Sequence, residues 1–131
     1  DLFSHRVLGW LLRRVDSFPV KRDSADLSAI KEAIRRVRKG KGLLLFPEGS
    51  RSFDGRLLDP QAGIGFLAAK LDVPVIPVFV KGAQDAWPKG AKFIRPKKIR
   101  VCFGQQISIE RRVPYADIAQ QIMAGVRHLS C

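Results

Sequence analysis

The chain has 131 residues, of which 46% are hydrophobic, and its 24 basic residues outnumber 12 acidic ones to give a formal net charge of +12. This length is enough for one domain with a hydrophobic core, and the apolar content excludes a disordered chain. The positive charge favours an anionic partner: a nucleic acid, an anionic lipid surface or a phosphorylated substrate. The alternative is a solvated basic face, because several basic clusters fall on the polar sides of predicted helices.

Two amphipathic helices are predicted in the first third of the chain. Apolar residues recur at helical spacing over residues 8–15 and again over residues 27–37, and Gly40 closes the second helix. The first helix, with Arg13 and Arg14 at its end, has two interpretations that the sequence leaves open. It either lies in a lipid interface or packs on the core of its own domain.

Three strands are predicted further along. The apolar run at residues 43–46 reads as a buried strand, and residues 73–80 form another that Pro74 and Pro77 bend. Residues 98–103 alternate polar and apolar side chains and form the third. Helices are predicted between and after these strands, at residues 62–71 and from Pro114 onward. The alternation of strands and helices predicts a three-layer α/β domain with a largely parallel sheet flanked by helices.

The turn after the first predicted strand carries the strongest functional signal. Glu48, Gly49, Ser50 and Arg51 follow the apolar run directly, and ligands of open α/β sheets collect beyond the carboxyl ends of strands. Gly49 lets the backbone approach a ligand, Ser50 offers a hydroxyl, and Arg51 offers a planar fork that suits phosphate. These residue types predict a site for a phosphate-bearing substrate.

Residues 46–52 (FPEGSRS) resemble the third conserved block of the glycerolipid acyltransferases of the lysophosphatidic acid acyltransferase type, with Ser50 where Thr is more usual. Residues 17–22 (SFPVKR) look like the second block, although Asp16 and Lys21 depart from its usual residues, and residues 73–78 (VPVIPV) look like the fourth. Three blocks in family order form a specific signal that covers nearly the whole chain. The resemblance implies a single acyltransferase domain over residues 1–131, of the bacterial kind.

What the resemblance implies chemically is transfer of a fatty acyl group from acyl-CoA or acyl carrier protein to the free hydroxyl of lysophosphatidic acid, within phospholipid biosynthesis and without a cofactor or metal. Arg22 and Arg51 are then expected to hold the acceptor phosphate. Glu48 is expected to accept from a glycerol hydroxyl or to fix Arg51, and Gly49 and Ser50 to shape the turn. The expected location is the cytoplasmic face of a membrane, with peripheral attachment to its anionic surface.

The family's catalytic block, a His followed after four residues by Asp, has no match in this sequence. His5 has Trp10 at the required spacing, and His128 lies close to the last residue. We therefore expect the general base and its orienting carboxylate to precede Asp1, the domain to be N-terminally truncated, and the 131 residues to be inactive alone. No residue of the chain is assigned a catalytic role.

Each assignment has a simpler alternative. For Arg51 the alternative is a surface ion pair with Glu48 or Asp54. For Arg22 it is an ordinary charge at the end of a short strand predicted at residues 18–20. For the whole chain, the alternative is a basic α/β module that binds phosphate or nucleic acid without catalysis. The scarcity of aromatic residues for base stacking argues against nucleic acid as the partner. The long connection at residues 81–97 is a candidate lid for substrate or membrane.

Overall fold

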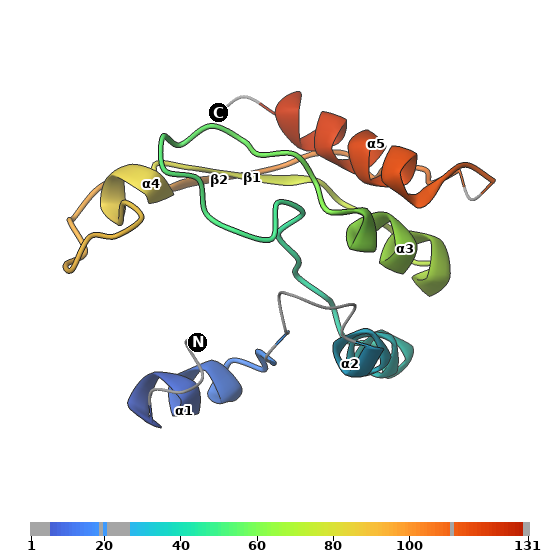
Figure 1. Ribbon diagram of the computed structural model, residues 1–131, viewed down its shortest axis with the longest axis horizontal. Coiled ribbons are helices and arrows are strands. Elements are labelled where there is room, and N and C mark those ends of the chain that lie inside the picture. Colours follow the sequence, from blue (N-terminus) through green and yellow to red (C-terminus); the bar gives the residue numbers. More distant parts are fainter. Residues whose placement is uncertain (1–5, 19, 21–26, 111, 130–131) are drawn as a thin grey trace. The chain divides into compact units, whose positions relative to one another are not determined.

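The computed structural model describes residues 6–18, 20, 27–110 and 112–129 (Figure 1). The chain separates into two compact units, Asp1–Leu43 and Leu44–Cys131. The first contains α1 (Arg6–Arg14) and α2 (Leu27–Arg38). The second contains α3 (Ala62–Leu71), β1 (Val78–Lys81), α4 (Ala83–Ala86), β2 (Arg100–Phe103) and α5 (Tyr115–Arg127). A single acyltransferase domain over residues 1–131 stays a prediction.

Both predicted helices of the first unit are confirmed, and both end in the same way. After α1, the Asp16 N–H donates to Arg13 O over 3.1 Å and the Ser17 N–H donates to Leu12 O over 3.0 Å, while Asp16 is left-handed with φ 59°. These bonds satisfy carbonyls that the end of a helix leaves without partners. Gly40, with φ 77°, closes α2 as expected. Among the described residues, no helix has both the length and the apolar content needed to cross a bilayer.

The core of the second unit lies between α3 and α5, which run side by side in Figure 1. Ile118 and Ile122 of α5 are buried against Ala68 of α3. Gly65 makes this packing possible, since a Cβ there would lie 1.8 Å from the Tyr115 carbonyl oxygen. Helix α3 was expected to pack on the sheet. Its small residues instead permit a close approach to α5.

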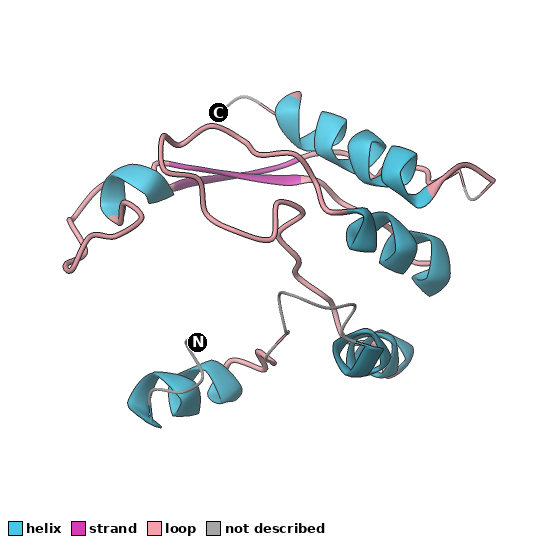
Figure 2. Cartoon of the chain, viewed as in Figure 1, coloured by secondary structure: helices cyan, strands magenta, loops and turns pink. Residues whose placement is uncertain are grey.

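The prediction of a three-layer domain with a largely parallel sheet is wrong for the part of the chain that the structure describes. Its only sheet there is the antiparallel pair β1–β2, in which Val78 lies opposite Phe103, and helices dominate (Figure 2). The strand predicted from residue 73 starts five residues later, because Pro74 and Pro77 have no N–H to donate to a ladder. A single bridge, between Val75 and Ile107, precedes it.

The strand predicted at residues 43–46 is also absent, since this segment has no strand beside it among the described residues and is drawn as loop in Figure 2. Leu44 is 73% exposed and Phe46 is 68% exposed. Apolar content predicted a buried strand, but a strand also needs a neighbour to supply its hydrogen bonds. The predicted turn consequently follows a loop.

Candidate functional site

The turn at residues 46–51 has a defined backbone shape. The Gly49 N–H donates to the Phe46 carbonyl over 3.1 Å, and Gly49 has φ 68°, a left-handed conformation that costs glycine little. A Cβ at this position would also come within 3.2 Å of Cγ of Gln61. The tight turn that the sequence predicted is therefore present, and it is closed on one side by Gln61.

The longer loop that carries this turn is tied together by its own polar groups. Glu48 Oε2 accepts a hydrogen bond of 2.6 Å from the Leu58 N–H, and the Gln61 N–H donates to the Pro47 carbonyl over 2.8 Å. Further along, Arg127 of α5 pairs with Asp59 at 3.2 Å. Together these contacts hold the two ends of the loop close to each other and to the start of α3.

Arg51 extends from the turn onto the segment that follows α4. Its Nη1 donates to the Trp87 carbonyl over 3.2 Å, and its guanidinium carbon lies 5.1 Å from the centroid of the Trp87 ring. The side chain is exposed, and no carboxylate pairs with it among the described residues. A guanidinium has five N–H donors, so one bond to a carbonyl leaves most of them directed at solvent. Arg51 is thus oriented by an aromatic face while its charge stays available to an anion.

A second contact joins the same two segments. Gln84 of α4 donates from Nε2 to the Phe53 carbonyl over 2.9 Å, and Lys89 Nζ lies 4.0 Å from the centroid of the Phe53 ring. Gln84 also lines a shallow depression of about 400 Å³ with Asp85, Pro88, Arg95 and Lys97. Residues 48–51 do not line this depression. The candidate site is therefore the surface around Trp87, where Arg51 lies on the Trp87 ring.

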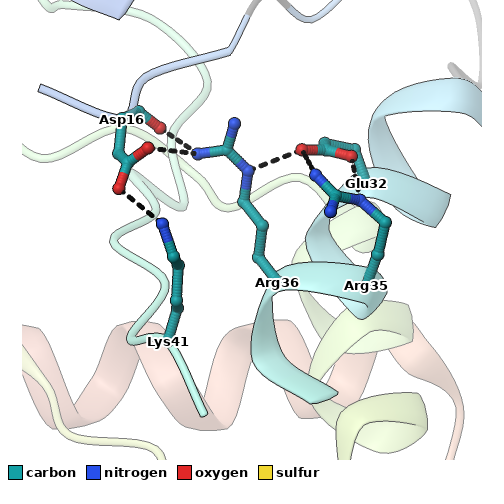
Figure 3. Close-up of polar contacts among 5 residues, drawn as sticks. All are labelled: Asp16, Glu32, Arg35, Arg36 and Lys41. Carbon is teal, nitrogen blue, oxygen red and sulfur yellow. Dashed lines mark hydrogen bonds and ion pairs between the residues drawn. The ribbon is translucent and has the colours of Figure 1, made fainter. Parts of the chain in front are cut away.

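The basic cluster of the first unit is organised differently (Figure 3). Both Arg35 and Arg36 donate to Glu32, with the Arg35 Nη2 to Glu32 Oε1 distance at 2.6 Å, and Lys41 Nζ donates to Asp16 Oδ2 over 2.7 Å. Arg36 also donates from Nη1 to the Asp16 carbonyl. Hydrogen bonds from Arg35 and then from Arg36 lower the pKa of Glu32 to about 2, and the bond from Lys41 lowers the pKa of Asp16. These cations already have anionic partners inside the chain.

The chain was compared with known proteins. Residues 1–81 match the family model described as Acyltransferase, which is more than half of the chain. This chain belongs to the acyltransferase family. The prediction made from residues 17–22, 46–52 and 73–78 is therefore confirmed.

Two curated relatives of this acyltransferase-family chain are named 1-acyl-sn-glycerol-3-phosphate acyltransferase. The protein of Limnanthes alba is 40% identical over 79 residues, which are 60% of this chain and 28% of the relative. That of Streptococcus pneumoniae is 32% identical over 110 residues, which are 83% of this chain and 39% of the relative. The chain thus spans between a quarter and two fifths of the length of these relatives.

A solved structure shows the same fold. The crystal structure of the 1-acyl-sn-glycerophosphate (LPA) acyltransferase PlsC from Thermotoga maritima superposes with a TM-score of 0.75 at 24% identity. The match covers 96% of the acyltransferase-family chain and 51% of the Thermotoga protein. The chain therefore has the fold of about half of that enzyme.

The structure brings together four of the five predicted site residues, because Glu48, Gly49, Ser50 and Arg51 share one turn. Arg22 lies outside the described residues. No bond joins Glu48 to Arg51 in the described part of the chain, so the expected fixing of Arg51 by Glu48 is not observed. Nor does Arg51 pair there with Glu48 or Asp54, the simpler alternative that the sequence left open.

The contact between Trp87 and Arg51 was not predicted from the sequence. Trp87 was placed in the long connection at residues 81–97 without a partner, and it lies 36 positions from Arg51 along the chain. No periodicity links residues so far apart. Guanidinium groups stack on aromatic faces, but the sequence does not indicate which aromatic residue lies beside Arg51.

The described residues contain one histidine, and the only carboxylate within the turn at residues 46–51 is Glu48. His128 is the only histidine among them, it is exposed at the end of α5, and its side chain makes no bond to a carboxylate there. In the same described ranges no three His, Cys, Asp or Glu side chains converge as metal ligands would. The turn thus offers the Arg51 guanidinium and the Glu48 carboxylate to a ligand.

Proposed function

We propose that the whole protein transfers a fatty acyl group from acyl-CoA or acyl carrier protein to the free hydroxyl of lysophosphatidic acid, forming phosphatidic acid for phospholipid biosynthesis. Membership of the acyltransferase family and the names of the relatives support this reaction. The observation that carries the proposal is the position of Arg51, which stacks on Trp87 and pairs with no carboxylate of the described residues. An exposed, oriented guanidinium is suited to the acceptor phosphate.

The turn binds the acceptor in this proposal. Arg51 donates charge-assisted hydrogen bonds to the phosphate, and Arg22 is the second cation. Gly49 and Ser50 shape the turn. Glu48 uses Oε2 to hold Leu58 in place, which leaves Oε1 to accept from a glycerol hydroxyl. A carboxylate would repel phosphate, so its place is beside the glycerol.

The chemical step needs a base that takes the proton of the acceptor hydroxyl as its oxygen attacks the thioester carbonyl. The tetrahedral intermediate then collapses, the C–S bond breaks, and the thiol leaves with a proton. The proposal assigns this base to a His oriented by an Asp, outside residues 1–131, because neither His5 nor His128 has Asp at the family spacing. The purified 131-residue chain is expected to show no turnover with thioester and lysophosphatidic acid, and measurable turnover would contradict this assignment.

Substitution of Arg51 in the full-length parent tests the binding role. Hydrogen bonds to a charged group contribute about 1.5–3 kcal/mol, so Arg51→Ala is expected to raise the KM for lysophosphatidic acid by roughly 10- to 100-fold. The KM for the acyl donor should change little. Arg36→Ala is the matched control, since its guanidinium already has Glu32 as a partner, and its acceptor KM should equal that of the wild type.

An unchanged acceptor KM in Arg51→Ala would remove Arg51 from the site. Equal rises in the acceptor and donor KM values would indicate a general disturbance of the fold. The alternative of a basic module that binds phosphate or nucleic acid without catalysis makes a different prediction, because the full-length protein would then show no acyl transfer at all.

A further inference from the structure

The loop at residues 86–95, which follows α4, is held in a fixed shape by its own hydrogen bonds. The Arg95 N–H donates to the Ala86 carbonyl over 2.7 Å and joins the two ends. Inside the loop, Trp87 Nε1 donates to the Ala91 carbonyl over 2.9 Å, and the Ala91 N–H donates to the Pro88 carbonyl over 3.0 Å. Three bonds within ten residues mean that the loop presents its side chains in a constant arrangement.

This ordered loop exposes two large apolar side chains next to each other. Phe93 is 81% exposed and Ile94 is 68% exposed. Phe53 is also 76% exposed, and Nζ of Lys89, a residue of the loop, lies over its ring. Single exposed apolar residues are common, but adjacent ones on a fixed loop indicate a surface that another molecule covers.

The same segment is strongly and uniformly basic. Residues 86–109 contain six cations and no Asp or Glu, and the cations are Lys89, Lys92, Arg95, Lys97, Lys98 and Arg100. None of them forms an ion pair with a carboxylate among the described residues. Asp85 lines the depression beside Arg95 and Lys97 without pairing with either. The partner of this surface must therefore combine negative charge with an apolar interior.

We infer that the loop at residues 86–95 docks the chain on an anionic phospholipid bilayer. Phe93 and Ile94 enter the boundary between headgroups and acyl chains, and Lys92, Arg95 and Lys97 lie among the lipid phosphates. An acidic protein or a nucleic acid would satisfy the cations but would offer Phe93 and Ile94 no acyl layer. The inference rests on the proposed function in one respect, that the acceptor of the reaction is a membrane lipid.

Helix α1 is the alternative membrane-binding surface within the chain. Trp10 is 59% exposed and Leu11 is 50% exposed, and Arg13 and Arg14 follow them. Its nine residues carry three arginines, and Arg14 lies over the Trp10 ring at 5.5 Å. A variant of this helix is accordingly the matched control.

Cosedimentation of the 131-residue chain with lipid vesicles tests the inference. We expect binding to vesicles of phosphatidylcholine mixed with phosphatidylglycerol. The double variant Phe93→Ser with Ile94→Ser should weaken that binding at least about tenfold, because two large apolar side chains no longer leave water. The control, Trp10→Ser with Leu11→Ser, should bind as the wild type does, and circular dichroism checks that both variants keep their helices.

Two further measurements separate insertion from simple charge attraction. Lys92→Gln with Lys97→Gln should weaken binding roughly tenfold or more on the anionic mixture and change little on pure phosphatidylcholine. The chain has two tryptophans, so Trp10→Phe leaves Trp87 as the only one. Lipids with brominated acyl chains should then quench its fluorescence on binding, because Trp87 lies in the docking loop.

The inference is overturned if the Phe93 and Ile94 variant binds normally, if the α1 variant alone loses binding, or if acyl carrier protein or duplex DNA outcompetes the vesicles at matched salt. It fails separately from the proposed function. An acceptor KM unaffected by Arg51→Ala would refute the proposed function, whereas normal vesicle binding by the Phe93 and Ile94 variant would refute only the docking.

Discussion

The two units of the chain use charge and packing in opposite ways. In Asp1–Leu43, described buried side chains are as small as Ala29 and Ala33, and polar contacts join the end of α1 to α2. In Leu44–Cys131, Ile118 and Met123 are fully buried, while Arg51 and the loop cations Lys89, Lys92, Arg95 and Lys97 form no ion pair with a carboxylate of the described residues. The first unit therefore depends on its ion pairs, and the second unit has a core that frees its cations for ligands.

This difference distinguishes two kinds of arginine that look alike in the sequence. Arg36 is 19% exposed along its side chain and contacts Glu32, Asp16 and the ring of Phe18. Arg51 is exposed and has an aromatic face and a carbonyl as its partners. A ligand phosphate has to compete with a carboxylate at Arg36, but at Arg51 it competes only with the neutral Trp87 carbonyl among the described residues. The family's motif and the pattern of ion pairs thus both favour Arg51 as the phosphate-binding residue.

The largest expected effect tests the core of the second unit. Gly65→Ala places a methyl group against the Tyr115 carbonyl, and we expect it to lower the free energy of unfolding by about 2–3 kcal/mol because α3 and α5 must move apart. Urea unfolding of the 131-residue chain, followed by circular dichroism, measures the change. Gly63→Ala is the control in the same helix, where a Cβ meets nothing within 4 Å. It should stabilise by about 0.5–1 kcal/mol through helix propensity. A stability for Gly65→Ala equal to the wild type would show that the helices do not pack this closely.

The second prediction concerns a variant in which Arg51, like Arg36, has a carboxylate beside it. Trp87→Glu removes the aromatic face and places a carboxylate near the guanidinium, so we expect the acceptor KM of the full-length parent to rise roughly tenfold or more. Trp87→Phe keeps a ring and should change the acceptor KM by only a few fold. Trp10→Glu is the matched control, because Trp10 carries Arg14 in a similar stack in the other unit. If Trp87→Glu leaves the acceptor KM unchanged, Trp87 does not position the phosphate-binding group.

Local patterns predicted the helices of this chain, and tertiary contacts decided the rest. The apolar stripes at residues 8–15 and 27–37 and the run of small residues at 62–71 were sufficient because a helix forms its hydrogen bonds within one segment. The prediction of a strand at residues 43–46 was wrong because a strand needs a second segment to pair with, and local sequence does not indicate which segment that is. The residues of the turn at 48–51 were found from their chemistry and family order. The contact between Arg51 and Trp87 could not be found, since it joins two loops through a fold that local sequence did not show.

The smallest expected effect concerns the ion pairs of the first unit. Hydrogen bonds from Arg35 and Arg36 lower the pKa of Glu32 from 4.5 to about 2, so the stabilisation from this carboxylate is present above pH 4.5 and is lost as the pH falls through about 2. Asp16, with its pKa lowered chiefly by Lys41, acts in the same direction.

Carbon-detected NMR titration of Glu32 in the folded chain, with the urea-unfolded chain as reference, measures this shift. Arg35→Gln should move the folded midpoint upward most, since the bond from Arg35 contributes most, and concentrated salt should move it in the same direction because these groups lie at the surface. A folded midpoint equal to the unfolded one would show that the cations of α2 are free, and the contrast with Arg51 would then no longer hold.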